Sequence, residues 1–510
     1  MRRREAPGHG GTSWGRASAL ALLLAVCATS QLEGQCPDGT PPPCAVPAAR
    51  PAPNSIAVLT FENITRDTSA RYLAEGLADQ IATRLGGVAR LTMISRSVVR
   101  RVRSPEQQSI QQLGRMLNAA YLVNGAIRAA SGRVRVNVEA VRAATGEAVW
   151  SEAYDRARDD LIGIEEAVAT EVAAGVAGRL SPAERRALGG RVTASSAAYE
   201  HYLRGNVLLA RRTTASLRSA IVAYRAATVA DSSFADAYGR LAYAYAMCAN
   251  WNCAAQDSLL VLARQAAAHA LRIDPRSSDA WMGRAYTLDA WWNWAELGNQ
   301  ADDSLLASLA AFRRAVALNP RNDEAWHQYG GTLEAVDDSA ALDALRRALA
   351  LDPARAVTYV DLSLTYARMG RLDRALETID SALMLEPDGP FIQMRATYRL
   401  LTGDTAGAVA DARLAPDRAP EVLAVFAHDS ASIQLMESRV VHPQWCDQAA
   451  VYLLWTGRRE QAVRAMLNCA PSLGTRLTFR WPELAPLAAD PRIQALRAET
   501  ERILAKARWR

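Results

Sequence analysis

The 510-residue sequence contains almost no lysine, because Lys506 is the only one among its 59 basic residues. No binding function requires arginine everywhere, so we attribute this to codon bias. Net charge is also low: four arginines and one glutamate in the first 30 residues contribute +3 of the +6. With no RNA- or DNA-binding motif either, nucleic acid is not an expected partner.

Motifs for catalysis and metal binding are missing as well. No P-loop, GxGxxG, HExxH, GxSxG or paired-carboxylate motif occurs in a suitable context. There is no CxxC or HxxxH ligand pair, and the six histidines are scattered. We therefore expect no enzyme activity, no catalytic residue, no cofactor and no metal.

Long apolar runs are also absent. The run ASALALLLAVCATS has 14 residues, too few for a membrane span, and it follows the basic segment MRRREAPGHGGTSWGR. We predict a signal peptide over residues 1–30, cleaved near Ser30, and a protein exported to the periplasm or cell envelope. Lipidation of Cys27 and an uncleaved inner-membrane anchor, with membrane proximity through the amino terminus, are the alternatives.

Cysteine is scarce, but its use agrees with export. Cleavage near Ser30 would remove Cys27 and leave six of the seven cysteines. An even number in an exported chain suggests disulfides, although six cysteines allow 15 pairings. Proximity favours three local bonds, which are Cys36–Cys44, Cys248–Cys253 and Cys446–Cys469.

A proline- and glycine-rich linker over 31–53 precedes a mixed segment over 54–190. SIAVLTF and LTMIS have strand character, and Leu73, Leu77, Ile81 and Leu85 share one helical face. After a helix at 105–117, the segments AYLVNGAIRAA, GRVRVNVEAVRA and EAVWSEAYDR predict an antiparallel meander. With a closing helix at 159–178, the order β-α-β-α-β-β-β-α predicts an α/β sandwich of about 125 residues.

This segment resembles the TolB-like amino-terminal domain family, which is similar to parts of CsgG and FlgO. The resemblance rests on IAVLTFEN, LAEGLADQIATRL, ISRS, YLVNGAIR and VRVNVEAVRAATGEAVWSEAYDR. It implies an accessory, non-catalytic domain of bacterial envelope or signalling proteins that is often followed by helical repeats. Some relatives carry a cyclase or DNA-binding domain, and this chain has neither.

A phrase recurs in the second half of the chain: HALRIDP, AVALNP, ALALDP and ALMLEP end at Pro275, Pro320, Pro353 and Pro387. A period near 34 with small residues at fixed offsets is typical of tetratricopeptide (TPR) repeats. We predict an all-α TPR solenoid over 195–470, with about 5–7 helical-hairpin units, and a helical cap over 471–510.

The resemblance to TPR repeats implies which residues line the concave face of the solenoid. They form an acidic surface with interleaved aromatics, followed by the apolar Val357, Val360 and Leu364. The residues of this predicted groove are Asp236, Tyr243, Asp279, Met282, Tyr286, Asp289, Glu324, His327 and Glu334. Ordinary solvated groove residues are the alternative interpretation.

Two further segments attract attention. WWNW contains Trp291, Trp292 and Trp294, which are either anchors for a partner or sugar, or core residues of a widened repeat. The basic run at 96–104 either contacts an acidic partner or phospholipid, or forms a solvated loop before a helix.

Together these features predict an exported envelope scaffold that binds a protein or peptide partner in its TPR groove. The alternatives are a membrane-linked regulatory or sensory module, related to TPR-containing cyclases or transcriptional regulators, and a carbohydrate-binding protein that uses WWNW.

Overall fold

The computed structural model describes residues 51–65, 69–102, 105–130, 132–251, 253, 256–294, 298–387, 389, 391–440, 446–468 and 481–508. Residues Ala52–Arg510 form one compact unit. The predicted signal peptide, and the linker up to residue 50, lie outside the described residues.

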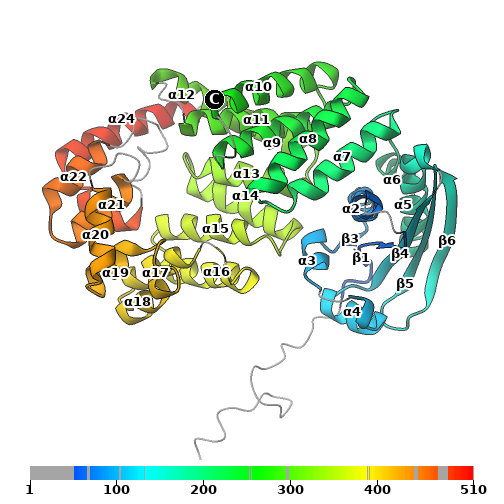
Figure 1. The fold of residues 1–510 in the computed structure, drawn as a ribbon, viewed down its shortest axis with the longest axis horizontal. Coiled ribbons are helices and arrows are strands. Elements are labelled where there is room, and N and C mark those ends of the chain that lie inside the picture. The colour runs from blue at the N-terminus through cyan, green and yellow to red at the C-terminus, as the bar shows by residue number, and fades with distance from the viewer. Residues whose placement is uncertain are drawn as a thin grey trace, which may run out of the picture. The chain divides into compact units, whose positions relative to one another are not determined.

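A small mixed sheet forms the centre of the amino-terminal part (Figure 1). Its strand order is β3-β1-β4-β5-β6, with the short β2 also paired to β4. Strand β1 runs parallel to β3 and β4, whereas β4, β5 and β6 are antiparallel, which confirms the predicted meander. The strands are β1 (Ser55–Val58), β2 (Glu62–Asn63), β3 (Thr92–Met93), β4 (Tyr121–Ala130), β5 (Arg133–Arg142) and β6 (Ala148–Ala157).

Helices pack on both faces of this sheet. Ile56 of β1 belongs to the core formed with α2 (Ser69–Gly86) and α5 (Leu161–Ala177). Its neighbour Ala57, which points to the opposite face, packs with α3 (Arg96–Arg101) and α4 (Ile110–Leu117). The amino-terminal domain thus contains a small mixed sheet with helices on both faces of β1, and the expected α/β sandwich is not confirmed as stated.

The basic run at 96–104 begins with helix α3, so the expectation of a solvated loop is wrong for residues 96–101. Ser95 caps the helix by accepting a hydrogen bond from the backbone of Val98. The side chains of Arg96 and Arg100 both pair with Asp79 of α2. Arg96 is consequently held against α2 with its side chain 14% exposed, whereas Arg100 stays exposed.

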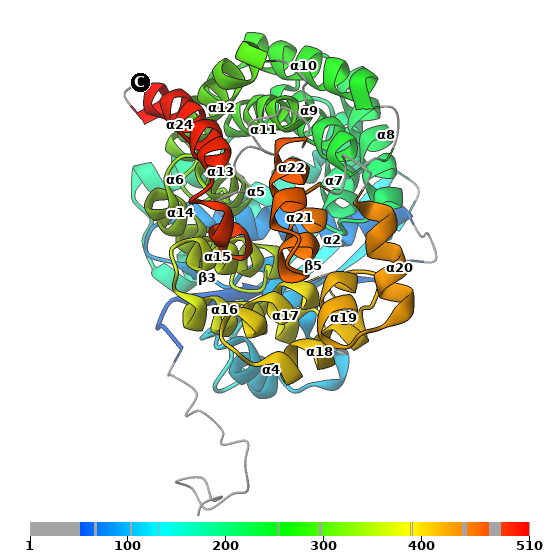
Figure 2. The same ribbon diagram turned by 90° about the vertical axis from the view of Figure 1, so that its left-hand side faces the viewer.

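Sixteen helices from α7 to α22 pack as consecutive antiparallel pairs in the described part of the chain. Figure 2 shows the pairs following one another along a curved path. The 3-10 helix η5 (Pro482–Leu487) and helix α24 (Pro491–Arg508) come after them. The paired helices are α7 (Ser196–Leu209), α8 (Thr214–Ala230), α9 (Ala235–Asn250), α10 (Gln256–Ile273), α11 (Ser278–Trp294), α12 (Gly298–Leu318), α13 (Asp323–Leu333), α14 (Asp338–Leu351), α15 (Ala356–Arg368), α16 (Leu372–Leu385), α17 (Ile392–Leu401), α18 (Thr405–Leu414), α19 (Pro420–Phe426), α20 (Ser430–Arg439), α21 (Cys446–Trp455) and α22 (Arg459–Leu467).

The recurring proline marks a contact that repeats along the solenoid. Trp281 Nε1 donates a hydrogen bond to the carbonyl oxygen of Pro275 at 2.8 Å, six residues earlier. Trp326 makes the same contact with Pro320 at 3.0 Å. Each aromatic side chain thus ties the first helix of a pair to the turn before it. In the next unit, the Tyr359 hydroxyl donates to Pro353 at 3.1 Å.

The sheet domain packs directly on the first repeat helix. Gly76 of α2 lies so close to Leu203 of α7 that an added Cβ would be 2.9 Å from the Leu203 Cβ. Beside this contact, the buried Glu165 accepts hydrogen bonds from Arg84 and from the hydroxyl of Tyr199. Arg84, Glu165 and Tyr199 therefore join α2, α5 and α7 into one core.

The cysteine predictions have different outcomes. Cys248 and Cys253 are free and buried, so the predicted bond between them is absent. Cys253 closes the turn after α9 through its backbone N–H, which donates to the Cys248 carbonyl at 2.9 Å. Cys446 is disulfide-bonded. Cys36, Cys44 and Cys469 lie outside the described residues, as do the side chains of Trp291, Trp292 and Trp294.

Candidate partner-binding groove and pocket

The predicted groove residues lie on α9, α11 and α13, the first helices of three successive pairs, except Glu334, which follows the end of α13. Their carboxylates already have partners within the chain. Asp279 accepts hydrogen bonds from Arg240 Nε at 2.8 Å and from the Tyr202 hydroxyl at 3.2 Å. Asp236 accepts one from the hydroxyl of Ser277. The groove is thus much less acidic than its sequence suggested.

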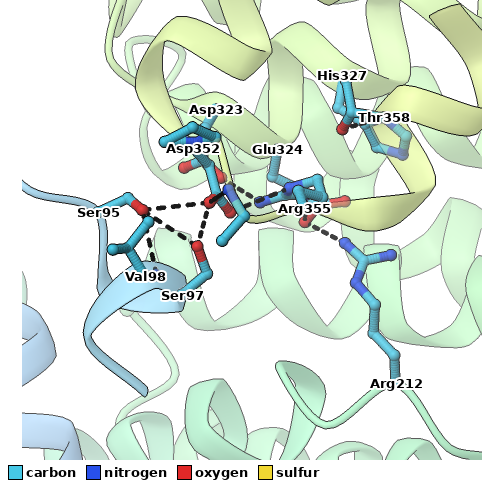
Figure 3. A network of polar contacts seen from close by, with 12 residues as sticks. Ser95, Ser97, Val98, Arg212, Asp323, Glu324, His327, Asp352, Arg355 and Thr358 are labelled. Atoms are coloured by element: carbon cyan, nitrogen blue, oxygen red, sulfur yellow. Dashed lines mark hydrogen bonds and ion pairs between the residues drawn. The ribbon is translucent and has the colours of Figure 1, made fainter. Parts of the chain in front are cut away.

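Glu324 is the centre of the largest of these networks (Figure 3). Arg212, from the turn between α7 and α8, and Arg355, which precedes α15, both donate to its Oε2; the Arg355 contact measures 2.6 Å. The other oxygen accepts from Tyr243 and from Gln328 Nε2, the latter at 3.0 Å. All four donors come from the chain itself, and they use the acceptor capacity of the carboxylate.

The network extends to the amino-terminal domain. Arg355 also pairs with Asp323 and, at 3.4 Å, with Asp352. The hydroxyls of Ser95 and Ser97, at the start of α3, donate to Asp352, Ser95 at 3.2 Å (Figure 3). The sheet domain and the middle repeats are therefore joined by a continuous set of polar contacts.

Burial and the neighbouring arginines determine the protonation states of Glu324 and His327. Although burial opposes ionisation, Arg212 and Arg355 hold the pKa of Glu324 well below its ordinary value. Burial, with Arg355 nearby, lowers the pKa of His327 to about 3, so this imidazole is neutral at physiological pH. His327 Nδ1 lies 3.1 Å from the hydroxyl of Thr358, with which it shares a hydrogen bond.

The remaining predicted positions are also enclosed. Tyr243 and Met282 are fully buried, and Tyr286, 8% exposed, accepts a hydrogen bond from Asn250 at 3.1 Å. Asp289 accepts one from Thr332 at 2.8 Å. The last position, Glu334, pairs with Arg368 at 3.1 Å. These residues are therefore mostly enclosed by the repeats, and their role in partner binding stays a prediction.

A separate cavity of about 610 Å³ opens among α15, α17, α19, α20, α21 and η5. We call it the C-terminal pocket. Its aromatic wall consists of Tyr398, Trp455 and Trp481, and its apolar wall includes Leu364, Met394 and Val451. Leu364 belongs to the predicted apolar continuation of the groove, whereas the rest of the pocket was missed. Apart from Leu364, the lining comes from segments that follow the last repeated proline phrase, which ends at Pro387.

Charged and amide side chains complete the C-terminal pocket. Four carboxylates face two arginines, and two glutamines lie among them. Gln448 bridges two of these groups, because its Nε2 donates to Glu421 at 2.7 Å and its Oε1 accepts from Arg439. The polar lining residues are Gln393, Asp417, Arg418, Glu421, Arg439, Asp447, Gln448 and Glu483.

The described residues contain no group of three or more His, Cys, Asp or Glu side chains arranged to hold a metal ion. None of the helices in that same part of the chain has the length and apolarity needed to cross a membrane.

Comparisons with known proteins give separate matches for the amino-terminal domain and for the repeats. Residues 52–169 match the family model of the HilA/YgeH-like transcriptional regulator, second domain. Residues 337–396 match the tetratricopeptide repeat family, which supports the repeat prediction. The resemblance of the amino-terminal domain to the TolB-like family is not confirmed.

A protein of Rhizobium meliloti (strain 1021) named "Putative adenylate cyclase 3" is 30% identical over 160 residues, covering 31% of this chain. The chain spans only 27% of that protein's length.

Several solved TPR structures are also similar. A thermophilic TPR protein of Thermus thermophilus is 22% identical and covers 40% of this chain and 100% of its own, with a TM-score of 0.34. YrrB, a TPR protein described as having an unusual peptide-binding site, is 24% identical and covers 38% and 89%, with a TM-score of 0.25. Pseudomonas aeruginosa PilF is 19% identical and covers 53% and 98%, with a TM-score of 0.31.

Proposed function

We propose that this chain is an exported, non-catalytic scaffold of the cell envelope that binds a partner polypeptide through its TPR repeats. The sheet domain acts as an accessory element, which the contacts of Ser95 and Ser97 with Asp352 hold against the middle repeats. Stacked helical hairpins commonly present extended surfaces to other polypeptides. The 14-residue apolar run after a basic segment supports export.

The C-terminal pocket is the observation that carries this proposal. Glu324 is already paired with Arg212 and Arg355 of the same chain, so a partner that docks there must first displace these arginines. The C-terminal pocket instead offers an open cavity with aromatic and charged walls. Aromatic anchors in such cavities supply much of the energy of many protein interfaces.

Affinity capture tests the scaffold function. The mature protein is used as bait on envelope fractions of its native host, beside a Trp455→Ala variant. Trp455 lines the C-terminal pocket, while Trp251, which is 38% exposed, lies outside it and provides the matched Trp251→Ala control. We expect one partner that wild type and the control retain and Trp455→Ala loses. Equal capture by all three proteins would contradict docking at this pocket.

Export has its own test. Amino-terminal sequencing of the protein from its host should find a start between about Gln31 and Cys36. Intact Met1 in the soluble cytosol would contradict export.

A membrane-linked regulatory module is the second candidate. The match of residues 52–169 to a regulator domain and the similarity to the Rhizobium protein both favour it. Fusions of the chain's carboxyl end to alkaline phosphatase and to β-galactosidase separate the two candidates. Activity of the β-galactosidase fusion alone would favour a regulator that faces the cytoplasm.

A further inference from the structure

Two buried acceptor atoms in the described part of the chain have no hydrogen-bond partner, and both belong to the C-terminal pocket. They are Gln393 Oε1 on α17 and Glu483 Oε2 on η5. Leaving a buried acceptor unsatisfied destabilises the fold, and more so when the acceptor is charged. Both residues line one cavity, and we take the two unsatisfied acceptors as the reason that a group with several N–H donors fits there.

The charges around these atoms select a cation. Glu421, Asp447 and Glu483 approach from α19, α21 and η5, while Asp417 lies at the exposed rim. Of the two arginines, Arg439 is engaged with Gln448, and Arg418 is exposed at the rim. The lining therefore carries two more acidic than basic side chains.

The aromatic wall narrows the choice of cation. Tyr398, Trp455 and Trp481 line the same cavity as the orphaned acceptors. A guanidinium group stacks on aromatic faces, is weakly hydrated and carries five N–H donors, whereas an ammonium group is compact and strongly hydrated. The combination of aromatic faces and two separate acceptors favours guanidinium.

We propose that the C-terminal pocket binds an arginine side chain of the partner polypeptide, with Gln393 Oε1 and Glu483 Oε2 accepting hydrogen bonds from its guanidinium group. This assignment rests on the proposed scaffold function and names the chemistry of its anchor. Glu483 supplies the charge, and the aromatic wall supplies the stacking surface.

Titration calorimetry with defined probes tests the assignment. The full mature protein is titrated with acetyl-Gly-Arg-Gly-amide, with the same peptide carrying citrulline, and with agmatine. Citrulline keeps the shape of arginine but replaces an N–H donor group with a neutral carbonyl. We expect the arginine peptide to bind about tenfold tighter or more, because a hydrogen-bonded charge is lost in the citrulline peptide. Equal affinities for the two peptides would overturn the proposal.

The variants locate the binding site. Glu483→Gln and Gln393→Leu should each remove most of the preference for arginine, whereas Glu386→Gln, an exposed carboxylate outside the pocket, should preserve it. Circular dichroism confirms that each variant is folded, and the comparison of arginine with citrulline in wild type requires no variant. An unchanged preference in both pocket variants would place the guanidinium elsewhere and refute the proposal.

The agmatine titration and the capture experiment together distinguish failure of this inference from failure of the proposed function. Agmatine that binds as tightly as the peptide would refute a polypeptide anchor and favour a free guanidine. Capture of a partner could depend on Trp455 while calorimetry finds no preference for the arginine peptide. That result would refute this inference without contradicting the scaffold function.

The pH dependence provides a second readout. Burial raises the pKa of Glu421 to about 7, and burial with Asp447 nearby raises that of Glu483. A cation binds better when these acids are ionised, so its binding releases protons and its affinity rises between about pH 6 and 8. The other charged groups of the lining are Asp447, Arg439, which contacts Gln448, and Asp417 and Arg418, which are exposed at the rim. An affinity that falls with pH would contradict the site.

Discussion

Replacing Glu324 with glutamine should destabilise the middle repeats, because the substitution removes the charge between Arg212 and Arg355 while keeping the shape. The side chains of these three residues are only 14%, 27% and 13% exposed. Removing one member of a buried ion pair costs about 3–5 kcal/mol. Arg355 keeps Asp323 and Asp352 as partners. We therefore expect a loss at the lower end, about 3 kcal/mol of unfolding free energy.

A matched exposed pair provides the control. Glu377 and Arg374 contact each other at 2.7 Å, but their side chains are 64% and 61% exposed. Glu377→Gln should change stability by less than about 1 kcal/mol, because water screens such pairs. Hydrogen exchange of peptides covering α13 and α15 reports the free energy of local opening there. This local measurement is needed because different repeats of one chain can open with different free energies. Similar exchange in both variants would refute the argument that the ion pairs of Arg212 and Arg355 with Glu324 stabilise the middle repeats.

Three further outcomes are expected. Because burial lowers the pKa of His327 to about 3, only the unfolded chain binds a proton there between about pH 6.5 and 3. Stability is therefore lost as pH falls through this window, and His327→Gln should make urea midpoints less dependent on pH; an unchanged slope would contradict this. Gly76→Val should cost about 1–3 kcal/mol in urea unfolding by pushing Leu203 away, whereas Gly331→Ala, whose nearest neighbour is 4.0 Å away, should stabilise by up to about 1 kcal/mol. The reverse order would rule out the close approach of α2 to α7. Burial raises the pKa of Cys248 to about 12, so mass spectrometry should find slow alkylation by iodoacetamide at about pH 8 until urea is added; rapid alkylation of the folded protein would count against burial.

Local patterns predicted much of the fold. The alternation of Val134, Val136 and Val138 with polar neighbours predicted β5 and its place in the meander, because strand side chains alternate between the two faces of a sheet. The repeated prolines predicted the helical pairs because they close turns, and an aromatic side chain donates a hydrogen bond to Pro275, Pro320 and Pro353. Such signals depend on residues only a few positions apart.

The candidate site was harder to predict. Glu324 has the repeat position of a groove residue, and nothing in the sequence indicates that Arg212, 112 residues away, pairs with it. An ion pair between distant segments depends on how the solenoid curves, which is a tertiary property. The C-terminal pocket was missed for a related reason, since η5 closes it from beyond the last helical pair, and the sequence of α19 and α20 does not carry the repeated proline phrase of the earlier units.

Site-specific photo-crosslinking tests most directly whether a partner docks in the C-terminal pocket. A photoreactive phenylalanine derivative replaces Thr397, which lines that pocket, or Met384, which is 78% exposed outside it. The account predicts that the captured partner crosslinks at Thr397 and not at Met384, and that the arginine peptide suppresses the crosslink while the citrulline peptide does not. Crosslinking at Met384 alone, or at Thr397 without competition by the arginine peptide, would contradict it.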